Sequence, residues 1–404
     1  MIVHQPEIKY HNDEIILFAK IEYDHQNHSL PEKFWFSFPK DYAPFLTKFS
    51  DPFAVALIQT SQYLGENLEI RGSTSERLAY GLQQYGMIFH LWNPKWFDPP
   101  RLKFEKISQE KPSEQRIVAT AFSGGVDSFY TLMHHLPQWQ PLPSYQVSAG
   151  LLIHGMEIRF FEAQKYELIY SVYKEMFNQL GLDLLRAKMN GYLFWEHRLR
   201  WEYVHGAPLV ATALCLSNKI SRFYIPATHS YDYLLHNGTS PITDHWLSTE
   251  LVDIIHHGSQ QSRMGKIEEI AHWEYPQRYL RVCTDVIHQE GINNCSKCNK
   301  CLRTMLMLDQ FGVLNKFTTF SKKITPASWF KYILTAPGGT YPKQLFQYAK
   351  RKKSVGKMIL AWFAIQTGRF HRYFSEHIVN ILSKEQLYKV KHRIYYKNRE
   401  KAIQ

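Results

Sequence analysis

The chain has 404 residues, 45% of them hydrophobic, which is enough to bury a full core and predicts a globular protein of two or three domains. The opening MIVHQPEIKY lacks the basic leader and apolar region of a signal peptide. The longest apolar stretch that we find, Met358 to Ile365, has eight residues, against the roughly 20 that span a bilayer. We therefore expect a cytoplasmic protein without a transmembrane segment.

The formal net charge of +12 comes from one end of the chain. Residues 341–404 hold 15 Lys and Arg and three acidic residues, so residues 1–340 sum to zero. Binding of an acidic partner, whether nucleic acid, acidic protein or acidic membrane surface, therefore concerns residues 341–404 alone. A solvated helical hairpin that covers the sheet is the simpler interpretation of the same segment.

Residues 1–106 predict a small α+β accessory domain, and the polar segment ISQEKPSEQR at 107–116 predicts a linker. The elements expected in the first domain are strands at EIILFAKIEY and KFWFSF, a helix at FAVALIQTSQYL, a strand at NLEIRG and a helix at SERLAYGLQQY.

Residues 117–312 alternate between strands and helices. The expected order is IVATAF, VDSFYTLMHHL, SAGLLIH, FEAQKYELIYSVYKEMFNQL, LDLLRAKM, HGAPLVATALCLSNK and RFYIPA. Strands separated by helices of this length form right-handed crossovers. We predict an α/β fold, a parallel sheet with helices on both faces, followed by a basic, mainly helical region at 313–404.

The first strand-to-helix turn of this series reads SGGVDS. Ser123, Gly124 and Gly125 lie at the turn, where glycines let backbone N–H groups approach a ligand and the following helix adds its positive dipole end. The hydroxyls of Ser123 and Ser128 could donate to phosphate oxygens. Asp127 could cap the helix or hold the Mg²⁺ of a nucleoside triphosphate. Ordinary turn-and-cap chemistry is the alternative.

The string S-G-G-x-D-S resembles the signature of the PP-loop ATP pyrophosphatases, also called adenine nucleotide alpha hydrolase-like proteins. The resemblance implies a Rossmann-like, HUP-type fold and an enzyme that cleaves ATP between its α- and β-phosphates to adenylate a carboxylate or carbonyl oxygen. A nucleophile then displaces AMP. The ATP-binding residues that it implies are Ser123, Gly124, Gly125, Val126, Asp127 and Ser128, with His154 and Gly155 framing the adenine and ribose.

Four of the five cysteines form C-x₁₁-C-x₂-C-x₂-C: Cys283, Cys295, Cys298 and Cys301. In the polar context NNCSKCNKC they are not packing residues, and four thiolates suit a closed, structural Zn²⁺ site. A redox set and an iron–sulfur cluster are the alternatives, because C-x₂-C-x₂-C also occurs in ferredoxins. The fifth, Cys215, lies in the apolar PLVATALCL and is expected to be a buried thiol.

Together the two motifs, over about residues 115–312, resemble 7-cyano-7-deazaguanine synthase. That resemblance implies a 7-deazapurine-like acid, or a related one, as substrate and ammonia or an amine as nucleophile. The chain departs from that family at residues 1–106, in its basic tail and in the loop IPATHSYDYLLHNGTSPITDHWLST. Loop residues expected to orient the substrate are Thr228, His229, Asp232, Thr243 and Asp244, although loop Asp and His are often turn formers.

Charge that develops on the leaving pyrophosphate needs nearby cations. Lys266 is the first candidate for this role and Arg263 the second, and both lie at the start of a predicted helix after the loop. The alternative interpretation of these two residues is a solvated helical face. Asp127, Lys266 and Arg263 are thus the catalytic candidates. We expect an ATP-dependent ligase that uses ATP, Mg²⁺ and structural zinc. A nucleic-acid or protein acceptor could bind at residues 341–404, and the chain could form a homodimer.

Two other functions fit the same motifs. A tRNA-modifying PP-loop enzyme of the thiolation or lysidine type would use the basic tail. A nucleotide-binding adaptor would keep the fold without turnover, although the intact SGGVDS favours an active enzyme.

Overall fold

The computed structural model describes residues 1–24, 30–109, 116–196, 198–283, 291–321, 323–335 and 340–381. These residues form two compact units. The first consists of Met1–Phe122, His134–Thr228 and Leu234–Ser259, and the second of Ser123–Met133, His229–Tyr233 and the described residues from Gln260 onward. Each unit is described by itself.

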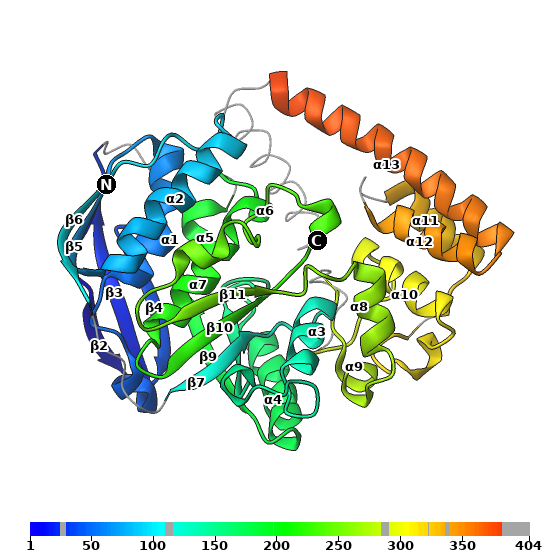
Figure 1. The fold of residues 1–404 in the computed structure, drawn as a ribbon, viewed down its shortest axis with the longest axis horizontal. Coiled ribbons are helices and arrows are strands. Elements are labelled where there is room, and N and C mark those ends of the chain that lie inside the picture. Colours follow the sequence, from blue (N-terminus) through cyan, green and yellow to red (C-terminus); the bar gives the residue numbers. More distant parts are fainter. Residues whose placement is uncertain are drawn as a thin grey trace. The chain divides into compact units, whose positions relative to one another are not determined.

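The first unit is built on one mixed, mostly parallel sheet of eleven described strands (Figure 1). The strands are β1 (Ile2–Val3), β2 (Glu7–His11), β3 (Glu14–Glu22), β4 (Lys33–Pro39), β5 (Leu68–Ser75), β6 (Leu102–Ser108), β7 (Ile117–Ala121), β8 (Ala149–His154), β9 (Asp183–Met189), β10 (Ile220–Pro226) and β11 (Asp253–His257). Their order is β11-β10-β7-β8-β9-β4-β3-β1-β5-β6, and β2 pairs with β3.

Strands β9-β8-β7-β10-β11 are all parallel, so by chain order this half of the sheet runs 3-2-1-4-5. The chain moves outward from β7 in one direction, then returns and moves outward in the other. Strand β8 is buried at every residue, as a central parallel strand should be, whereas β3 alternates between buried and exposed positions.

The strands of residues 1–108 extend this same sheet. Strand β4 pairs antiparallel with β9 through Phe36 with Met189 and Ser37 with Lys188. The side-chain amide of Asn190 strengthens the junction, because Asn190 Oδ1 accepts from Trp35 N at 2.9 Å and Asn190 Nδ2 donates to Lys33 O at 2.8 Å. The N-terminal strands and the parallel strands thus share one hydrogen-bonded layer.

Helices cover both faces of the sheet in the first unit. Alternate residues of a strand point to opposite faces. On β9, Arg186 packs its guanidinium on Tyr170 of α4, whereas the sulfur of Met189 accepts from Thr212 of α7, so these two helices lie on opposite faces. Helix α1 packs beside α7. The helices are α1 (Asp51–Leu64), α2 (Glu76–Trp92), α4 (Ala163–Gln179), α5 (Tyr192–Trp195), α6 (Trp201–Val204) and α7 (Gly206–Cys215), with 3₁₀ turns η1 (Lys40–Phe45), η2 (Pro143–Tyr145) and η4 (Asp244–Leu247).

The second unit is helical where it is described. Its elements are α3 (Val126–His134, of which residues 126–133 belong here), η3 (Tyr231–Tyr233), α8 (Arg263–Ile270), α9 (Glu274–Tyr279), α10 (Asn299–Gln310), η5 (Leu314–Lys316), α11 (Pro326–Thr335), α12 (Thr340–Arg351) and α13 (Val355–Ile381). Leu302, Met305 and Leu306 of α10 are buried at helical spacing and form part of its core.

The α/β class that the sequence predicts is confirmed, as are the flanking helices. None of the described helices has the length and hydropathy needed to cross a membrane. The expected linker falls partly on residues 110–115, which lie outside the described residues.

Candidate functional site

The SGGVDS segment forms a tight turn that opens helix α3. Gly124 has φ of 77°, a left-handed conformation that side chains disfavour. Gly125 O then accepts from Phe129 N at 3.0 Å and from the hydroxyl of Ser128 at 2.9 Å. The Ser128 hydroxyl thus stabilises the turn. The first N–H groups of a helix have no acceptor within it, so the turn presents donors at the helix start.

Asp127 lies in the first turn of α3 and is held by two cations of α8. Its Oδ2 accepts from Arg263 Nη1 at 2.5 Å and its Oδ1 from Lys266 Nζ at 3.3 Å. The start of α8 is fixed by its N-cap, Ser262, whose hydroxyl accepts from Gly265 N at 3.1 Å. The structure thus brings the three catalytic candidates, Asp127, Arg263 and Lys266, together in one cluster within the second unit.

Burial and mutual charge set the protonation of this cluster. Burial raises the pKa of Asp127, but Arg263 and Lys266 outweigh it, and the net pKa lies below the ordinary value of a carboxyl. Burial lowers the pKa of Lys266, and Asp127 opposes that shift only in part. Lys266 is only 1% exposed and lies 5.5 Å from the ring centre of Tyr130. It is therefore a buried cation and not part of a solvated helical face.

Two further buried arginines complete the cluster, and sequence reasoning missed both. Arg281 donates from its backbone N to Gly124 O at 2.8 Å and from Nη1 to Ser123 O at 3.4 Å. Arg303 lies with its guanidinium 3.9 Å from the ring centre of Tyr341. Burial lowers the pKa of Arg303, as does nearby Arg263, while Tyr341 and Asp127 oppose the shift.

Among the described residues, four buried cations belong to this cluster. Arg281 and Arg303 are 6% and 7% exposed, the Nε of each has no hydrogen-bond partner, and neither forms an ion pair with a described carboxylate. Asp127 pairs with the other two cations. A buried cation is costly unless it is paired, and cations gathered at the start of a helix favour a bound anion.

The four cysteines of the C-x₁₁-C-x₂-C-x₂-C motif converge in the second unit. Their sulfurs all lie within 4.8 Å of one another. Cys283 and Cys298 Sγ are 4.0 Å apart, and Cys295 and Cys301 Sγ are 3.8 Å apart. Four sulfurs at about 2.3 Å from a single ion form a tetrahedron with edges of about 3.8 Å. The cluster could therefore hold a metal such as zinc.

Backbone donors favour a thiolate at Cys295, whereas crowding and burial oppose one at Cys301. Cys295 Sγ accepts from the backbone N of Lys297 at 3.4 Å and of Cys298 at 3.2 Å. The neighbouring thiols of Cys283 and Cys298, followed by burial, raise the pKa of Cys301. A divalent cation would supply the opposite charge that lets four thiolates lie this close.

A short segment connects the cysteine cluster to the SGGVDS turn. Arg281 binds the turn and lies two residues before Cys283. Asn294 fixes this segment, because its Oδ1 accepts from Val282 N at 2.8 Å and Cys283 N at 3.0 Å while its Nδ2 donates to Leu280 O at 2.8 Å. Whatever stabilises Cys283 therefore also holds Arg281 over the turn.

His154 and Gly155, expected to frame a nucleotide, end β8 in the first unit. The His154 ring is 2% exposed, stacks between Phe160 and Tyr166, and shares a 2.9 Å hydrogen bond between Nε2 and Arg159 O. Burial lowers the pKa of His154, so the ring is neutral at pH 7. Gly155 is buried as well, and its backbone N donates to Ile158 O at 2.9 Å.

The five expected substrate residues fall into different environments. Thr228 is partly buried, His229 lies 6.3 Å from Tyr233 between ring centres, and Asp232 is exposed in η3. Thr243 and Asp244 are buried in the first unit. Of the five, Thr243 and Asp244 contact each other through a hydrogen bond between their side chains.

Asp244 anchors a buried hydrogen-bonded chain. Its Oδ1 accepts from Ser240 N at 2.9 Å and from the Thr243 hydroxyl at 3.1 Å. Its Oδ2 lies 2.7 Å from His256 Nδ1, and His256 Nε2 lies 3.0 Å from the hydroxyl of Ser259. With side-chain exposures of 1% and 5%, the Asp244 and His256 pair fixes the end of β11 to the loop before η4.

Asp244→Ala should therefore destabilise the protein by about 3 kcal/mol, because it leaves buried donors and His256 without their acceptor. Chemical denaturation would measure this change. Asp232→Ala, in the same loop region but exposed, is the matched control and should change the unfolding free energy by less than about 0.5 kcal/mol. Unchanged stability of Asp244→Ala with loss of activity would contradict the structural role and support contact with substrate.

Residues 1–106 support the loop that carries these residues. Arg77 of α2 donates from its backbone N to Glu250 Oε1 at 2.8 Å and from Nη1 to Thr249 O at 3.0 Å. Gly81 has no room for a side chain, because a Cβ there would lie 1.9 Å from Trp246 O. Helix α2 thus packs directly on this loop within the first unit. Residues 1–106, which lie outside the PP-loop resemblance, therefore have a structural role in supporting the loop.

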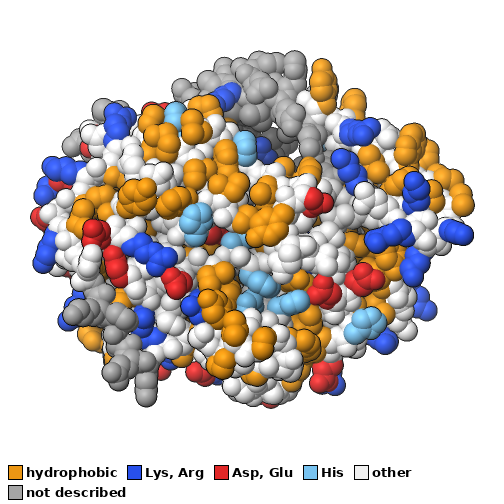
Figure 2. Space-filling model, in the orientation of Figure 1, with side chains coloured by type: hydrophobic (Ala, Val, Ile, Leu, Met, Phe, Trp, Pro, Cys, Tyr) orange, Lys and Arg blue, Asp and Glu red, His pale blue; other side chains and the backbone are white. Residues whose placement is uncertain are grey.

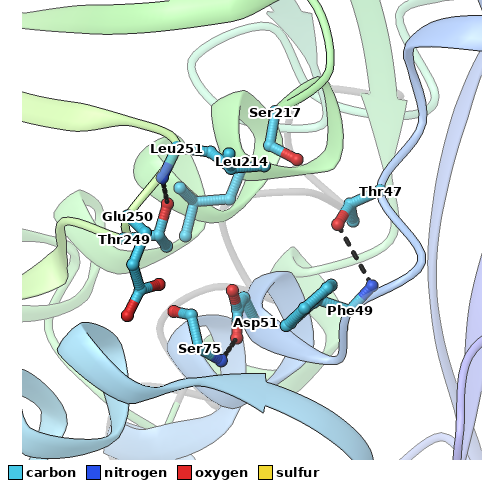
Figure 3. Close-up of a pocket in the computed structure, with 9 residues that line it drawn as sticks. All are labelled: Thr47, Phe49, Asp51, Ser75, Leu214, Ser217, Thr249, Glu250 and Leu251. Carbon is cyan, nitrogen blue, oxygen red and sulfur yellow. Dashed lines mark hydrogen bonds between the residues drawn. The ribbon is translucent and has the colours of Figure 1, made fainter. Parts of the chain in front are cut away.

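A small cavity with polar groups in its wall lies between the start of α1, the end of α7 and the loop at residues 249–251 (Figure 3). Buried polar atoms of Ser75, Ser217 and Glu250 in its wall have no hydrogen-bond partner among the described residues. Its volume of about 10 Å³ suits one water-sized guest. None of the expected site residues lines it, and a nucleotide or an organic acid would not fit.

Comparisons with models of protein families, with curated proteins and with solved structures gave no match to this chain. Its chemistry is therefore inferred from its residues and their geometry.

Proposed function

We propose that the second unit binds the triphosphate of ATP, and that the protein is an ATP-dependent, AMP-forming ligase of the PP-loop pyrophosphatase type. One observation carries the proposal: Arg263, Lys266, Arg281 and Arg303 are buried around the SGGVDS turn with Asp127 as the carboxylate that pairs with two of them. A polyphosphate would form charge-assisted hydrogen bonds with these cations, and the start of α3 supplies N–H donors.

Lys266, Arg263 and Asp127 have distinct roles in the proposed reaction. A carboxylate oxygen of the substrate attacks the α-phosphorus, the bond from that phosphorus to the bridging oxygen breaks, and pyrophosphate leaves. Lys266 and Arg263 neutralise the charge that grows on the leaving group. Asp127 positions both cations. Ammonia or an amine then attacks the acyl carbon, loses a proton and displaces AMP.

The fold supports a nucleotide-binding function. The order 3-2-1-4-5 of β9-β8-β7-β10-β11 is that of Rossmann-like, doubly wound sheets, which bind ligands beyond the carboxyl ends of their strands. The SGGVDS turn follows β7, the strand from which the chain moves outward in both directions. The assignment to the HUP type rests on this order together with the turn. Mg²⁺ would enter with the triphosphate.

We propose that the four cysteines hold one structural Zn²⁺. The sulfur separations of 3.8 and 4.0 Å fit a single tetrahedral ion. An iron–sulfur cluster places its own sulfides between the ligands and needs the cysteine sulfurs farther apart. With all four ligands from protein, the ion would supply folding energy and no open position for chemistry.

For the substrate we propose a 7-deazapurine-like or related acid, with ammonia or an amine as acceptor. A tRNA-modifying enzyme is the alternative. Within it, thiolation is disfavoured, because burial raises the pKa of the Cys215 thiol and the other four cysteines are clustered. Lysidine-type chemistry keeps its support from the basic residues beyond 340.

Incubation with ATP labelled at the α-phosphate, Mg²⁺, 7-carboxy-7-deazaguanine and ammonia tests the proposal. We expect labelled AMP, formed only when the acid is present. If the natural amine is part of a macromolecule, cell extract used instead of ammonia should yield that macromolecule with the deazapurine attached. AMP without need of the acid would keep the chemistry and overturn the substrate. ADP, or binding without products, would overturn the ligase and favour a nucleotide-binding adaptor.

A further inference from the structure

Helix α13 exposes large apolar side chains on one face, a feature that the proposed function does not use. Val355, Ile359, Trp362 and Phe363 are 65%, 52%, 47% and 48% exposed. Their spacing of i, i+4, i+7 and i+8 puts them on a single stripe. We call these four residues the apolar face of α13. Phe370, 65% exposed, continues the stripe toward the end of the helix.

The opposite face of α13 is the one that packs against the protein. Ala361, Ala364 and Gly368 are buried there, and the hydroxyl of Thr367 donates to Ile333 O of α11 at 2.7 Å. Lys357 pairs with Asp309 of α10 at 2.8 Å and fixes the helix further. The small residues thus face inward and the large apolar residues outward. This arrangement is the reverse of an ordinary surface helix, whose large apolar residues face the core.

Positive charge surrounds the apolar face. Residues 326–375 contain nine Lys and Arg and no Asp or Glu. Lys350, Arg351, Lys352 and Lys353 are exposed in the segment that leads into α13, and Arg369 is exposed on the helix itself. Figure 2 shows hydrophobic and basic side chains gathered together over the region where α13 runs in Figure 1. The surface is therefore both apolar and strongly cationic.

We propose that the apolar face of α13 inserts into the interface of an anionic lipid membrane. Aromatic and aliphatic residues on one face with Lys and Arg beside them define a helix that lies in the headgroup region without crossing it. A second copy of this chain would bring like charges together. A nucleic acid would use the aromatic residues by stacking but leaves Val355 and Ile359 exposed. The proposal does not depend on the ligase activity.

Flotation of the full-length protein with vesicles tests this. Vesicles that contain 30% phosphatidylserine, roughly the charge of an anionic leaflet, should bind the protein at least about tenfold more tightly than neutral phosphatidylcholine vesicles at 0.1 M salt. Trp362→Glu/Phe363→Glu should reduce binding by about tenfold or more. Lys350→Glu/Lys352→Glu should reduce it only for the anionic vesicles.

Leu91→Glu/Leu168→Glu is the matched control, because both side chains are exposed, at 71% and 51%, in helices of the first unit. It should bind vesicles like the unchanged protein. Equal binding by the Trp362→Glu/Phe363→Glu variant would overturn the proposal. The proposal would also be overturned if the unchanged protein did not bind vesicles but bound itself or RNA, and the same variant abolished that binding. Light scattering would detect self-association, and a gel shift would detect RNA binding. Unchanged melting temperatures would show that all variants fold.

Discussion

Lys266→Met should lower AMP formation by roughly 10²- to 10³-fold, the usual effect of removing one group that stabilises transition-state charge. Lys266 is buried, contacts Asp127 and lies beside the ring of Tyr130, so no other lysine from solvent can replace it. Affinity for ATP should change by less than about tenfold, because Arg263, Arg281 and Arg303 still neutralise the ground-state phosphates. Steady-state kinetics with α-labelled ATP would separate kcat from KM.

Lys316→Met is the control for this change, since Lys316 is an exposed lysine of the second unit in η5. It should leave both kcat and KM unchanged. Equal losses of ATP affinity and turnover in Lys266→Met would show uniform binding of substrate and transition state. Unchanged turnover would remove Lys266 from the catalytic proposal and leave the arginines as the anion-binding groups.

The pH profile gives a second readout of the same residue. Because burial lowers the pKa of Lys266, its charge is lost at a lower pH than that of an exposed lysine. As the pH rises through this lowered pKa, turnover should fall. Lys266→Arg should shift that alkaline limb to higher pH, since a guanidinium keeps its proton. An alkaline limb that does not move would assign the titration to another group.

Local patterns explain what the sequence predicts well. The SGGVDS turn depends on six adjacent residues, and the cysteine cluster on a spacing that leaves few other geometries. The cluster of buried cations needed more than that. Arg281 and Arg303 come from segments far along the chain from the SGGVDS turn, and only folding shows that Arg281 binds Gly124 and that Arg303 is buried near Arg263 and Asp127. Their one sequence signal is that each lies two residues from a cysteine of the motif.

Long-range pairing explains what the sequence does not predict. The antiparallel contact of β4 with β9, which joins residues 1–108 to the parallel strands, has no local signature. Strands β2 and β6 are not among the predicted elements, and each is exposed along most of its length. Asp244 illustrates the limit for a single residue: its type and loop predict contact with substrate, and only the structure adds its hydrogen bonds to Ser240 and His256.

Removing the proposed zinc ion should have the other large effect, on folding and on nucleotide binding together. Cys301→Ser, or a strong chelator, would leave thiols crowded within 4.8 Å of one another, without the charge that holds them. Structural zinc contributes roughly 10–16 kcal/mol of apparent binding energy in small zinc domains, so we expect the second unit to lose cooperative unfolding. Elemental analysis and calorimetry of the purified protein would measure metal content and melting.

Cys215→Ser is the control for the metal experiment, because Cys215 is buried in α7 of the first unit and takes no part in the cluster. It should keep one zinc per chain. Pyrophosphate binding should fall in Cys301→Ser, since Cys283 ends the segment from which Arg281 binds Gly124. Iron with sulfide in the anaerobic protein would replace zinc by a cluster. A Cys301→Ser protein with full pyrophosphate affinity would show instead that Asn294 alone holds Arg281 in place.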